Sequence, residues 1–119
     1  MSRAARSVVV FGIYALVAGA GFVLVPNLAL ATLGIPATTE VWIRVLGVVV
    51  AILGVYYIVA ARSGVVAYFR ASVWGRASFL LATVALAVLG LGPVALVGFG
   101  VIDGAGALWT ALALRGARA

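Results

Sequence analysis

The chain has no cysteine and no histidine, and its only acidic side chains are those of Glu40 and Asp103. The absence of cysteine excludes disulfides, thiolate chemistry and cysteine-based zinc sites. Without histidine, the chain has no imidazole to ligate a haem or to act as a general acid or base. Two carboxylates are too few for a carboxylate-rich metal cage. We therefore expect no metal, no cofactor and no enzymatic activity.

Charged residues are also scarce, at 8% of the chain, whereas hydrophobic residues make up 67%. Soluble domains carry roughly 25% charged residues, and a chain of 119 residues has too much surface for its volume to hide this many apolar groups from water. The composition predicts a single integral membrane domain over residues 1–119. The net charge of +6 does not indicate nucleic-acid binding, because the arginines lie at the ends of apolar stretches and not in a basic stripe interleaved with aromatics.

Four apolar stretches are long enough to cross a bilayer as helices, which takes about 20 residues each. The first stretch has a competing interpretation as a signal peptide, with Ala29-Leu30-Ala31 as a cleavage site. Its apolar run exceeds the ~7–15 residues usual for such a segment, and further spans follow it. We predict an all-α fold, a four-helix transmembrane bundle with up-down topology. Its spans cover residues 8–25, 41–61, 73–91 and 94–114.

Two connections between spans carry structure of their own. After Pro26, residues 28–33 are expected to form one or two helical turns at the membrane interface, ended by Gly34 as a C-cap. Between the second and third spans, residues 65–75 combine apolar and aromatic bulk with small or basic residues at i, i+4 and i+7 from Ser63 to Arg70. This pattern predicts a short amphipathic segment in the headgroup plane.

The arginines are divided very unequally between the two sides of the predicted bundle. Seven of the eight arginines fall on one side, and only Arg44, within the second span, falls on the other. Because basic residues favour cytoplasmic loops, we predict a multi-pass protein of the cell membrane with both termini in the cytoplasm. The arginines on the predicted cytoplasmic side are Arg3, Arg6, Arg62, Arg70, Arg76, Arg115 and Arg118.

Small residues recur at helical spacing and predict close helix packing, which replaces the hydrophobic effect between helices in lipid. Gly47, Ala51 and Gly54 share a face of the second span. Gly100 and Gly104 form a GxxxG pair in the fourth. Such a pair drives dimerisation in some isolated helices, but in a bundle of four helices we expect it to pack within the chain.

Asp103 is the most informative polar residue, because it lies about nine residues inside the fourth span and so near the bilayer midplane. An ionised Asp there costs roughly 2.5–3.5 kcal/mol on insertion scales, so it should be paired, protonated or directed inward. Arg44 lies within about 6 Å of the same depth at ~1.5 Å per residue, and Glu40 precedes it by one helical turn. We expect an intramembrane polar network of Glu40, Arg44, Asp103 and Thr110, either as a proton or cation site or as a structural contact.

The remaining candidates are aromatic and basic. Tyr56 and Tyr57 are possible ligand contacts, although adjacent helical residues point about 100° apart and at least one should anchor the interface instead. Trp42 and Trp74 are expected as ligand or interface contacts on the two faces of the membrane. The arginines expected to contact lipid phosphates are Arg62, Arg70 and Arg76.

One part of the sequence resembles a known family. The residues Leu33-Gly34-Ile35-Pro36, Trp42-Ile43-Arg44-Val45-Leu46-Gly47 and Gly54-Val55-Tyr56-Tyr57, followed by Ala61-Arg62 and Gly75-Arg76, resemble the BphX-like family of small bacterial four-span membrane proteins. The resemblance covers roughly the first two-thirds of the chain. It implies a compact bundle in a bacterial inner membrane, sometimes associated with the degradation of aromatic compounds, and it supplies no catalytic residues.

These observations favour a non-catalytic bundle that acts as an accessory protein, a subunit or a binder of a lipophilic ligand. The alternative is a small transporter or proton-coupled carrier that uses Asp103. An enzyme is the weakest of the three because no second intramembrane carboxylate, histidine or cysteine is present for acid–base work. The expected partners are membrane lipids and, beyond them, other membrane proteins or further copies of the chain.

Overall fold

The computed structural model describes residues 1–118, with side chains to residue 116, and the regular secondary structure of this part is entirely α-helical. Four helices are long and apolar enough to cross a membrane, so the four-span prediction is confirmed. The side chain of Arg118, which we counted on the basic side, and residue 119 lie outside the described part. The helices are α1 (Arg3–Leu24), α2 (Pro26–Thr32), α3 (Trp42–Arg62), α4 (Val66–Val88) and α5 (Ala95–Arg118).

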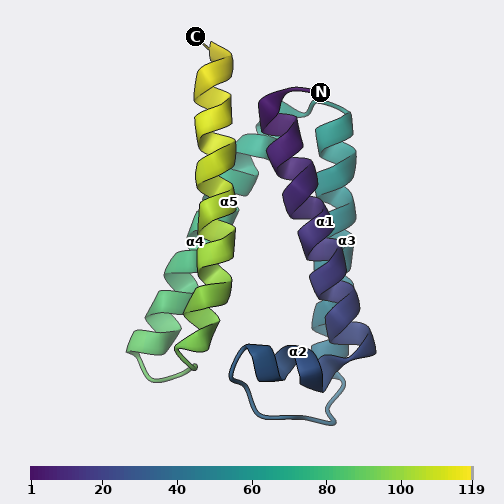
Figure 1. The fold of residues 1–119 in the computed structure, drawn as a ribbon, viewed down its shortest axis with the longest axis vertical. Helices are drawn as coiled ribbons and strands as arrows, with labels where there is room; N and C mark the ends of the chain where they lie inside the picture. Colours follow the sequence, from purple (N-terminus) through teal and green to yellow (C-terminus); the bar gives the residue numbers. More distant parts are fainter. Residues whose placement is uncertain (119) are drawn as a thin grey trace.

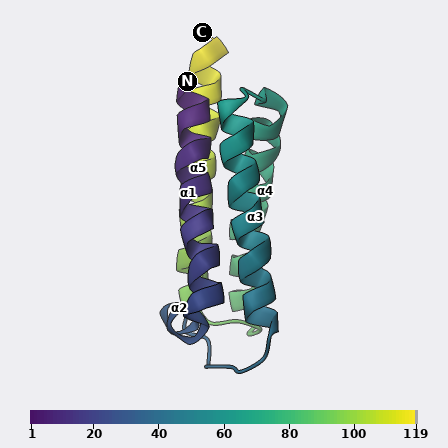
Figure 2. The same ribbon diagram turned by 90° about the vertical axis from the view of Figure 1, so that its right-hand side faces the viewer.

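The four long helices form two antiparallel pairs. Helix α1 packs along α3, and α4 packs along α5. The pairs are joined mainly where α1 contacts α5, whereas α3 and α4 share few contacts. Figure 2 looks onto the α1/α3 pair, with α5 behind α1 and α4 behind α3. The bundle is therefore well packed along one seam and loosely packed along the other.

The short helix α2 closes the end of the bundle farther from the chain termini. Figure 1 shows the two pairs diverging toward this end, where α2 lies across their axes. Leu30 and Leu33 pack there with Phe22 and Ile43 in a small buried core. The prediction of one or two helical turns after Pro26 is confirmed. Gly34, with a φ of 70°, ends the helix as expected, because Ile35 N donates to Leu30 O and Gly34 N to Ala31 O in a glycine C-cap.

Glycine lets α1 and α3 approach until their backbones touch. A Cβ on Gly19 would lie 2.6 Å from the backbone of Gly47, and one on Gly54 would lie 2.7 Å from Gly12 O. The predicted packing through small residues is confirmed for this pair. The GxxxG pair of α5 also packs within the chain, because Cβ atoms at Gly100 and Gly104 would both meet Leu80 of α4.

The predicted amphipathic segment between the second and third spans is not formed. Helix α4 begins at Val66 and runs without a break to Val88. The sequence contains no proline in this stretch, and Gly75 is accommodated inside the helix. The polar positions near Ser63 lie at the end of the helix, where Arg70 is exposed. The third span therefore starts about seven residues earlier than expected.

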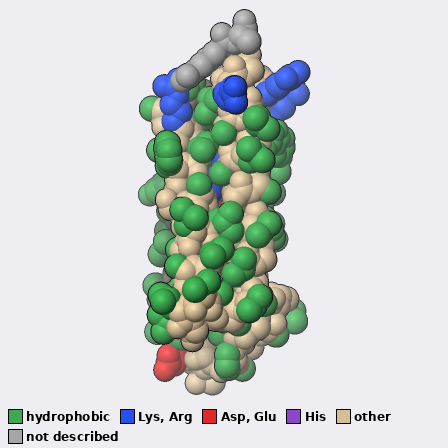
Figure 3. Space-filling model, turned by 90° about the vertical axis from the view of Figure 1, so that its left-hand side faces the viewer, with side chains coloured by type: hydrophobic (Ala, Val, Ile, Leu, Met, Phe, Trp, Pro, Cys, Tyr) green, Lys and Arg blue, Asp and Glu red, His purple; other side chains and the backbone are tan. Residues whose placement is uncertain are grey.

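The outside of the bundle is apolar between its two ends. Large hydrophobic side chains such as Val17, Leu81 and Leu108 are 60–70% exposed, which suits a surface that faces lipid. Basic side chains gather at the end that carries the chain termini, and an acidic side chain lies at the opposite end (Figure 3). This distribution and the four apolar helices are those of a small multi-pass membrane protein.

Candidate functional site

A buried arginine lies at the centre of the bundle. Arg76, on the inner face of α4, is only 2% exposed. It lies about ten residues from the start of the helix, which places it ~15 Å into the span. We expected Arg76 to contact lipid headgroups, and the structure corrects this. The expectation depended on a third span that began near residue 73, whereas α4 starts at Val66 and carries Arg76 into the interior.

Hydroxyl groups from α4 and α5 hold the guanidinium of Arg76, and a third hydroxyl, from α1, extends the cluster. Nε donates to the carbonyl of Ser72 at 3.1 Å. Nη2 donates to Ser72 Oγ at 3.0 Å and to Thr110 Oγ1 of α5 at 2.9 Å. Thr110 Oγ1 in turn lies 2.6 Å from Ser7 Oγ of α1. Because the Ser7 hydroxyl donates to the carbonyl of Ala4, the Thr110 hydroxyl is the donor to Ser7, and the chain of hydrogen bonds runs in one direction from Arg76.

The third nitrogen of Arg76 has no partner. Nη1 is buried and makes no hydrogen bond. The guanidinium carbon lies 4.8 Å from the centre of the Phe11 ring and 5.9 Å from that of Tyr57, so aromatic faces stabilise the cation without satisfying its N–H groups. A buried charged donor left unpaired is costly, and the side chain that carries it also lines a cavity.

That cavity is a pocket of about 470 Å³ between the two helix pairs. Its walls are mostly apolar and include aromatic side chains from all four long helices. Leu53 of α3, 41% exposed, lines the pocket together with Ala71 and Gly75 of α4, which are also exposed. The pocket therefore opens sideways between α3 and α4, toward the surrounding lipid. The aromatic residues that line it are Phe11, Tyr14, Tyr57, Tyr68, Phe79 and Phe99.

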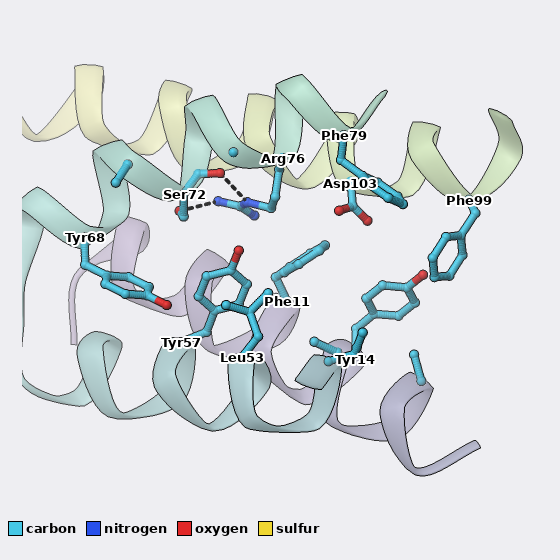
Figure 4. A pocket seen from close by; sticks show the side chains of 15 residues that line it. Phe11, Tyr14, Leu53, Tyr57, Tyr68, Ser72, Arg76, Phe79, Phe99 and Asp103 are labelled. Carbon is cyan, nitrogen blue, oxygen red and sulfur yellow. Dashed lines mark hydrogen bonds between the residues drawn. The ribbon is translucent and has the colours of Figure 1, made fainter. Parts of the chain in front are cut away.

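Two further polar groups reach the pocket. The half-buried carboxylate of Asp103 lines the same pocket as Arg76 and lies between Arg76 and Phe99 (Figure 4). No hydrogen bond joins Asp103 to another of the pocket side chains drawn there. The hydroxyl of Tyr14 is buried without a partner and points toward the side of the pocket that carries Arg76 and Asp103 (Figure 4). The pocket thus collects a cation, a carboxylate and an unsatisfied hydroxyl in an apolar surrounding.

The predicted polar network is brought together only in part. Thr110 is fully buried and belongs to the Arg76 cluster, and Asp103 lines the adjoining pocket. Arg44 and Glu40 are exposed. Arg44 Nη1 donates to the carbonyl of Val23 on α1, and Glu40 is held through its backbone N–H by the Thr38 hydroxyl at 3.0 Å. A similar depth in the membrane did not make Arg44 a neighbour of Asp103, because α5 pairs with α4 and not with α3.

The other predicted residues separate as their helical positions require. Tyr57 lines the pocket, whereas Tyr56 is 57% exposed on the outside of α3. Trp42 and Trp74 are 43% and 76% exposed, outside the pocket. Arg62 and Arg70 are exposed at the end of the bundle that carries the termini, where contact with lipid phosphates stays a prediction.

Sequence reasoning missed Ser7, Ser72 and Tyr14. A signal for the first two was present. Ser72 and Arg76 stand four residues apart on one helical face, and Ser7 is a lone hydroxyl near the start of an apolar run. Hydroxyls of this kind often hydrogen-bond across helices in membranes. Tyr14 had no distinguishing signal, because its role depends on the rings packed beside it, Phe11 at 5.4 Å and Phe99 at 6.1 Å.

In the described part of the chain, no three His, Cys, Asp or Glu side chains come together as a metal site. Comparison with protein-family models, with curated proteins and with solved structures gives no match for this chain. The resemblance to the BphX-like family therefore stays a prediction. Two of the residues that line the pocket, Arg76 and Tyr14, each carry a buried polar atom with no hydrogen-bond partner in the described part of the chain.

Proposed function

We propose that this protein is a non-catalytic binder of a lipophilic molecule, which it holds inside the membrane in the pocket between α3 and α4. The observation that carries the proposal is that Arg76, whose Nη1 has no hydrogen-bond partner, lines a cavity of about 470 Å³. This volume is within the range of about 300–1,000 Å³ of small-molecule sites, which combine apolar walls with a few polar groups that fix orientation.

The polar groups argue against a pocket that only accommodates lipid tails. Acyl chains would fill the apolar walls but would leave Arg76 Nη1 and Tyr14 Oη without partners. Each unsatisfied polar group in hydrocarbon costs several kcal/mol. A phospholipid keeps its headgroup at the membrane surface, whereas Arg76 lies ~15 Å along its helix. The occupant that suits this pocket is a small molecule that carries a polar group deep into the bundle and leaves its apolar part toward the lipid.

The proposal includes a location and an orientation. The exposed arginines at the termini end, among them Arg3, Arg62 and Arg115, support a cell membrane with both termini in the cytoplasm. Membrane lipids are the proposed direct partners, and the bound molecule would be delivered to or received from other membrane proteins. Transport with Asp103 as a proton site is less well supported. The pocket opens to the side, and the polar cluster of Arg76, Ser72, Thr110 and Ser7 occupies only part of the length of the bundle.

The tyrosines provide a direct test of binding. Tyr14, Tyr57 and Tyr68 line the pocket, while Tyr56, the fourth tyrosine of the chain, faces outward. Protein labelled with 3-fluorotyrosine and placed in phosphatidylcholine nanodiscs is titrated with 2-naphthol and followed by fluorine NMR. We expect saturable shifts of the three pocket signals and an unchanged Tyr56 signal. Tyrosine-to-phenylalanine variants assign the four signals.

Two glycines supply a matched pair of variants. A side chain at Gly75 points into open space at the pocket mouth, whereas one at Gly98 points into open space away from the pocket. Gly75→Leu should abolish the shifts, and Gly98→Leu should keep them. Equal shifts in the two variants, or shifts that include Tyr56, would mean that the probe only partitions into the surrounding lipid, and the proposed function would be wrong.

A further inference from the structure

The two charged side chains that line the pocket carry opposite hydrogen-bonding groups. Arg76 Nη1 carries N–H groups without acceptors, and the carboxylate of Asp103 is an acceptor that lines the same pocket (Figure 4). The protein already uses the other nitrogens of Arg76, which donate to Ser72 and Thr110. Nη1 is therefore the donor that the fold leaves for a bound molecule.

The charges of the pair limit what that molecule can be. An anionic group would accept from Arg76 but would be repelled by the carboxylate of Asp103. A cationic group would meet the reverse problem at Arg76. An ether or ketone oxygen would accept from Arg76 and give nothing to Asp103. A hydroxyl group suits both residues, because its oxygen accepts from Nη1 while its O–H donates to the carboxylate.

The walls indicate what should carry the hydroxyl. Phe11 and Tyr57 lie with ring centres 5.5 Å apart, and Phe79 and Phe99 with theirs 5.9 Å apart. These rings come from different helices and line the two sides of the polar pair (Figure 4). Aromatic rings prefer offset-stacked or edge-to-face partners at centre distances of about 4.5–7 Å. A planar ring with a hydroxyl substituent makes such contacts on both sides, which a flexible alkyl chain does not.

We infer that the pocket selects an uncharged aromatic compound that carries a hydroxyl group, which binds between Arg76 Nη1 and the carboxylate of Asp103. This inference rests on the proposed function and specifies its ligand class. The hydroxyl lies deep in the pocket, and the rest of the ring points to the mouth at Gly75 and Leu53. Tyr14 Oη, also unpaired, is placed to join the same hydrogen-bonded group.

Three probes of nearly the same size test the inference by the fluorine NMR titration described above. 2-Naphthol both donates and accepts, 2-methoxynaphthalene only accepts, and naphthalene does neither. Dissociation constants are expressed per lipid in the nanodisc, so that differences in partitioning cancel. A hydrogen bond to a charged group is worth enough to change affinity by at least about tenfold. We expect 2-naphthol to bind about tenfold or more tightly than its methyl ether, and naphthalene to bind most weakly.

Removal of the acceptor isolates the role of Asp103. In Asp103→Leu the preference for 2-naphthol over 2-methoxynaphthalene should fall to within about twofold, with both still shifting the pocket tyrosines. If that variant is not monodisperse, Asp103→Asn replaces it and should show a reduced preference, since an uncharged acceptor forms the weaker hydrogen bond.

The possible outcomes distinguish a failure of the inference from a failure of the proposed function. Equal affinities of the wild-type protein for the three probes would overturn the inference and leave the proposed binding function intact. Tighter binding of 2-naphthoate than of 2-naphthol would overturn it in favour of an anion site at Arg76. If none of the probes shifts the pocket tyrosines of the wild type, both the inference and the proposed function fail.

Discussion

The substitution Thr110→Val tests whether the buried polar cluster holds the helices together. Thr110 is fully buried. Its hydroxyl accepts from Arg76 Nη2 at 2.9 Å and donates to Ser7 Oγ at 2.6 Å. Valine has nearly the same shape, so the change removes the hydroxyl and leaves the packing of α1, α4 and α5 in place. One N–H of a buried guanidinium then loses its acceptor.

The expected loss of stability in Thr110→Val follows from the two hydrogen bonds of the Thr110 hydroxyl. In bilayers, side-chain hydrogen bonds between helices average about 0.6 kcal/mol and reach about 1.7 kcal/mol. The bond from Arg76 is charge-assisted and buried, and the loss of an acceptor for such a donor costs about 1–3 kcal/mol or more. We expect Thr110→Val to lower the free energy of unfolding by about 2 kcal/mol. The unfolding equilibrium constant then rises by roughly 30-fold.

Reversible unfolding in mixed detergent micelles, followed by circular dichroism, measures this change. Thr83→Val is the matched control. Thr83 is equally buried, but its hydroxyl donates only to the carbonyl of Leu80 in its own helix, at 2.8 Å. The control should cost well under 1 kcal/mol, since no interhelical partner is lost.

Two results would refute this reasoning. The first is a cost for Thr110→Val that lies within about 0.5 kcal/mol of the Thr83→Val cost, the level expected for a surface change. The second concerns Ser7→Ala, which removes only the far end of the chain of hydrogen bonds. If the costs of Ser7→Ala and Thr110→Val add in the double variant, the two hydroxyls do not act together.

Three further predictions concern packing, charge and topology. Gly19→Ala places a methyl group 2.6 Å from backbone atoms of α3 and should lower the free energy of unfolding by about 1–3 kcal/mol. Gly98→Ala, in open space, should not lower it, and equal effects of the two variants in the same unfolding assay would argue against backbone contact between α1 and α3. Asp103→Asn should leave the free energy of unfolding unchanged or raise it, because an ionised Asp at mid-membrane costs roughly 2.5–3.5 kcal/mol on insertion scales; a clear loss would instead give Asp103 a structural role. Since the chain has no cysteine, single cysteines report topology: in intact cells an impermeant maleimide should label Thr39→Cys and spare Ser63→Cys, and the reverse pattern would place the termini outside.

The sequence was sufficient to predict the four long helices, because hydropathy and the length of an apolar stretch are local properties. Each long apolar stretch became a helix, and glycine ended helices where the chain turns, as at Gly34 and Gly64. The boundary of the third span was wrong because residues 65–75 show both an apolar helical pattern and a polar repeat. Only packing decides between a helix lying on the membrane and the first turns of a helix crossing it.

The site was harder to predict because it depends on which helices are neighbours. Depth in the membrane can be counted from the sequence, and by depth Arg44 was as good a partner for Asp103 as any residue. The choice between Arg44 and Arg76 depended on the pairing of α5 with α4, which no local pattern encodes. Thr110 was identified because it lies on the helical face of Asp103, a relation that the sequence does contain.

The sideways opening of the pocket has a consequence for selectivity. Its mouth, at Leu53 and Gly75, faces the acyl chains of the bilayer. These chains are present at a very high concentration and compete with any ligand for the pocket. Apolar walls alone therefore discriminate poorly, since leaving the bilayer for the pocket gains little from the hydrophobic effect. Recognition of a ligand must come almost wholly from the few polar atoms deep in the pocket. The fraction of protein with an occupied pocket should therefore change in membranes whose acyl chains are shorter or less tightly packed.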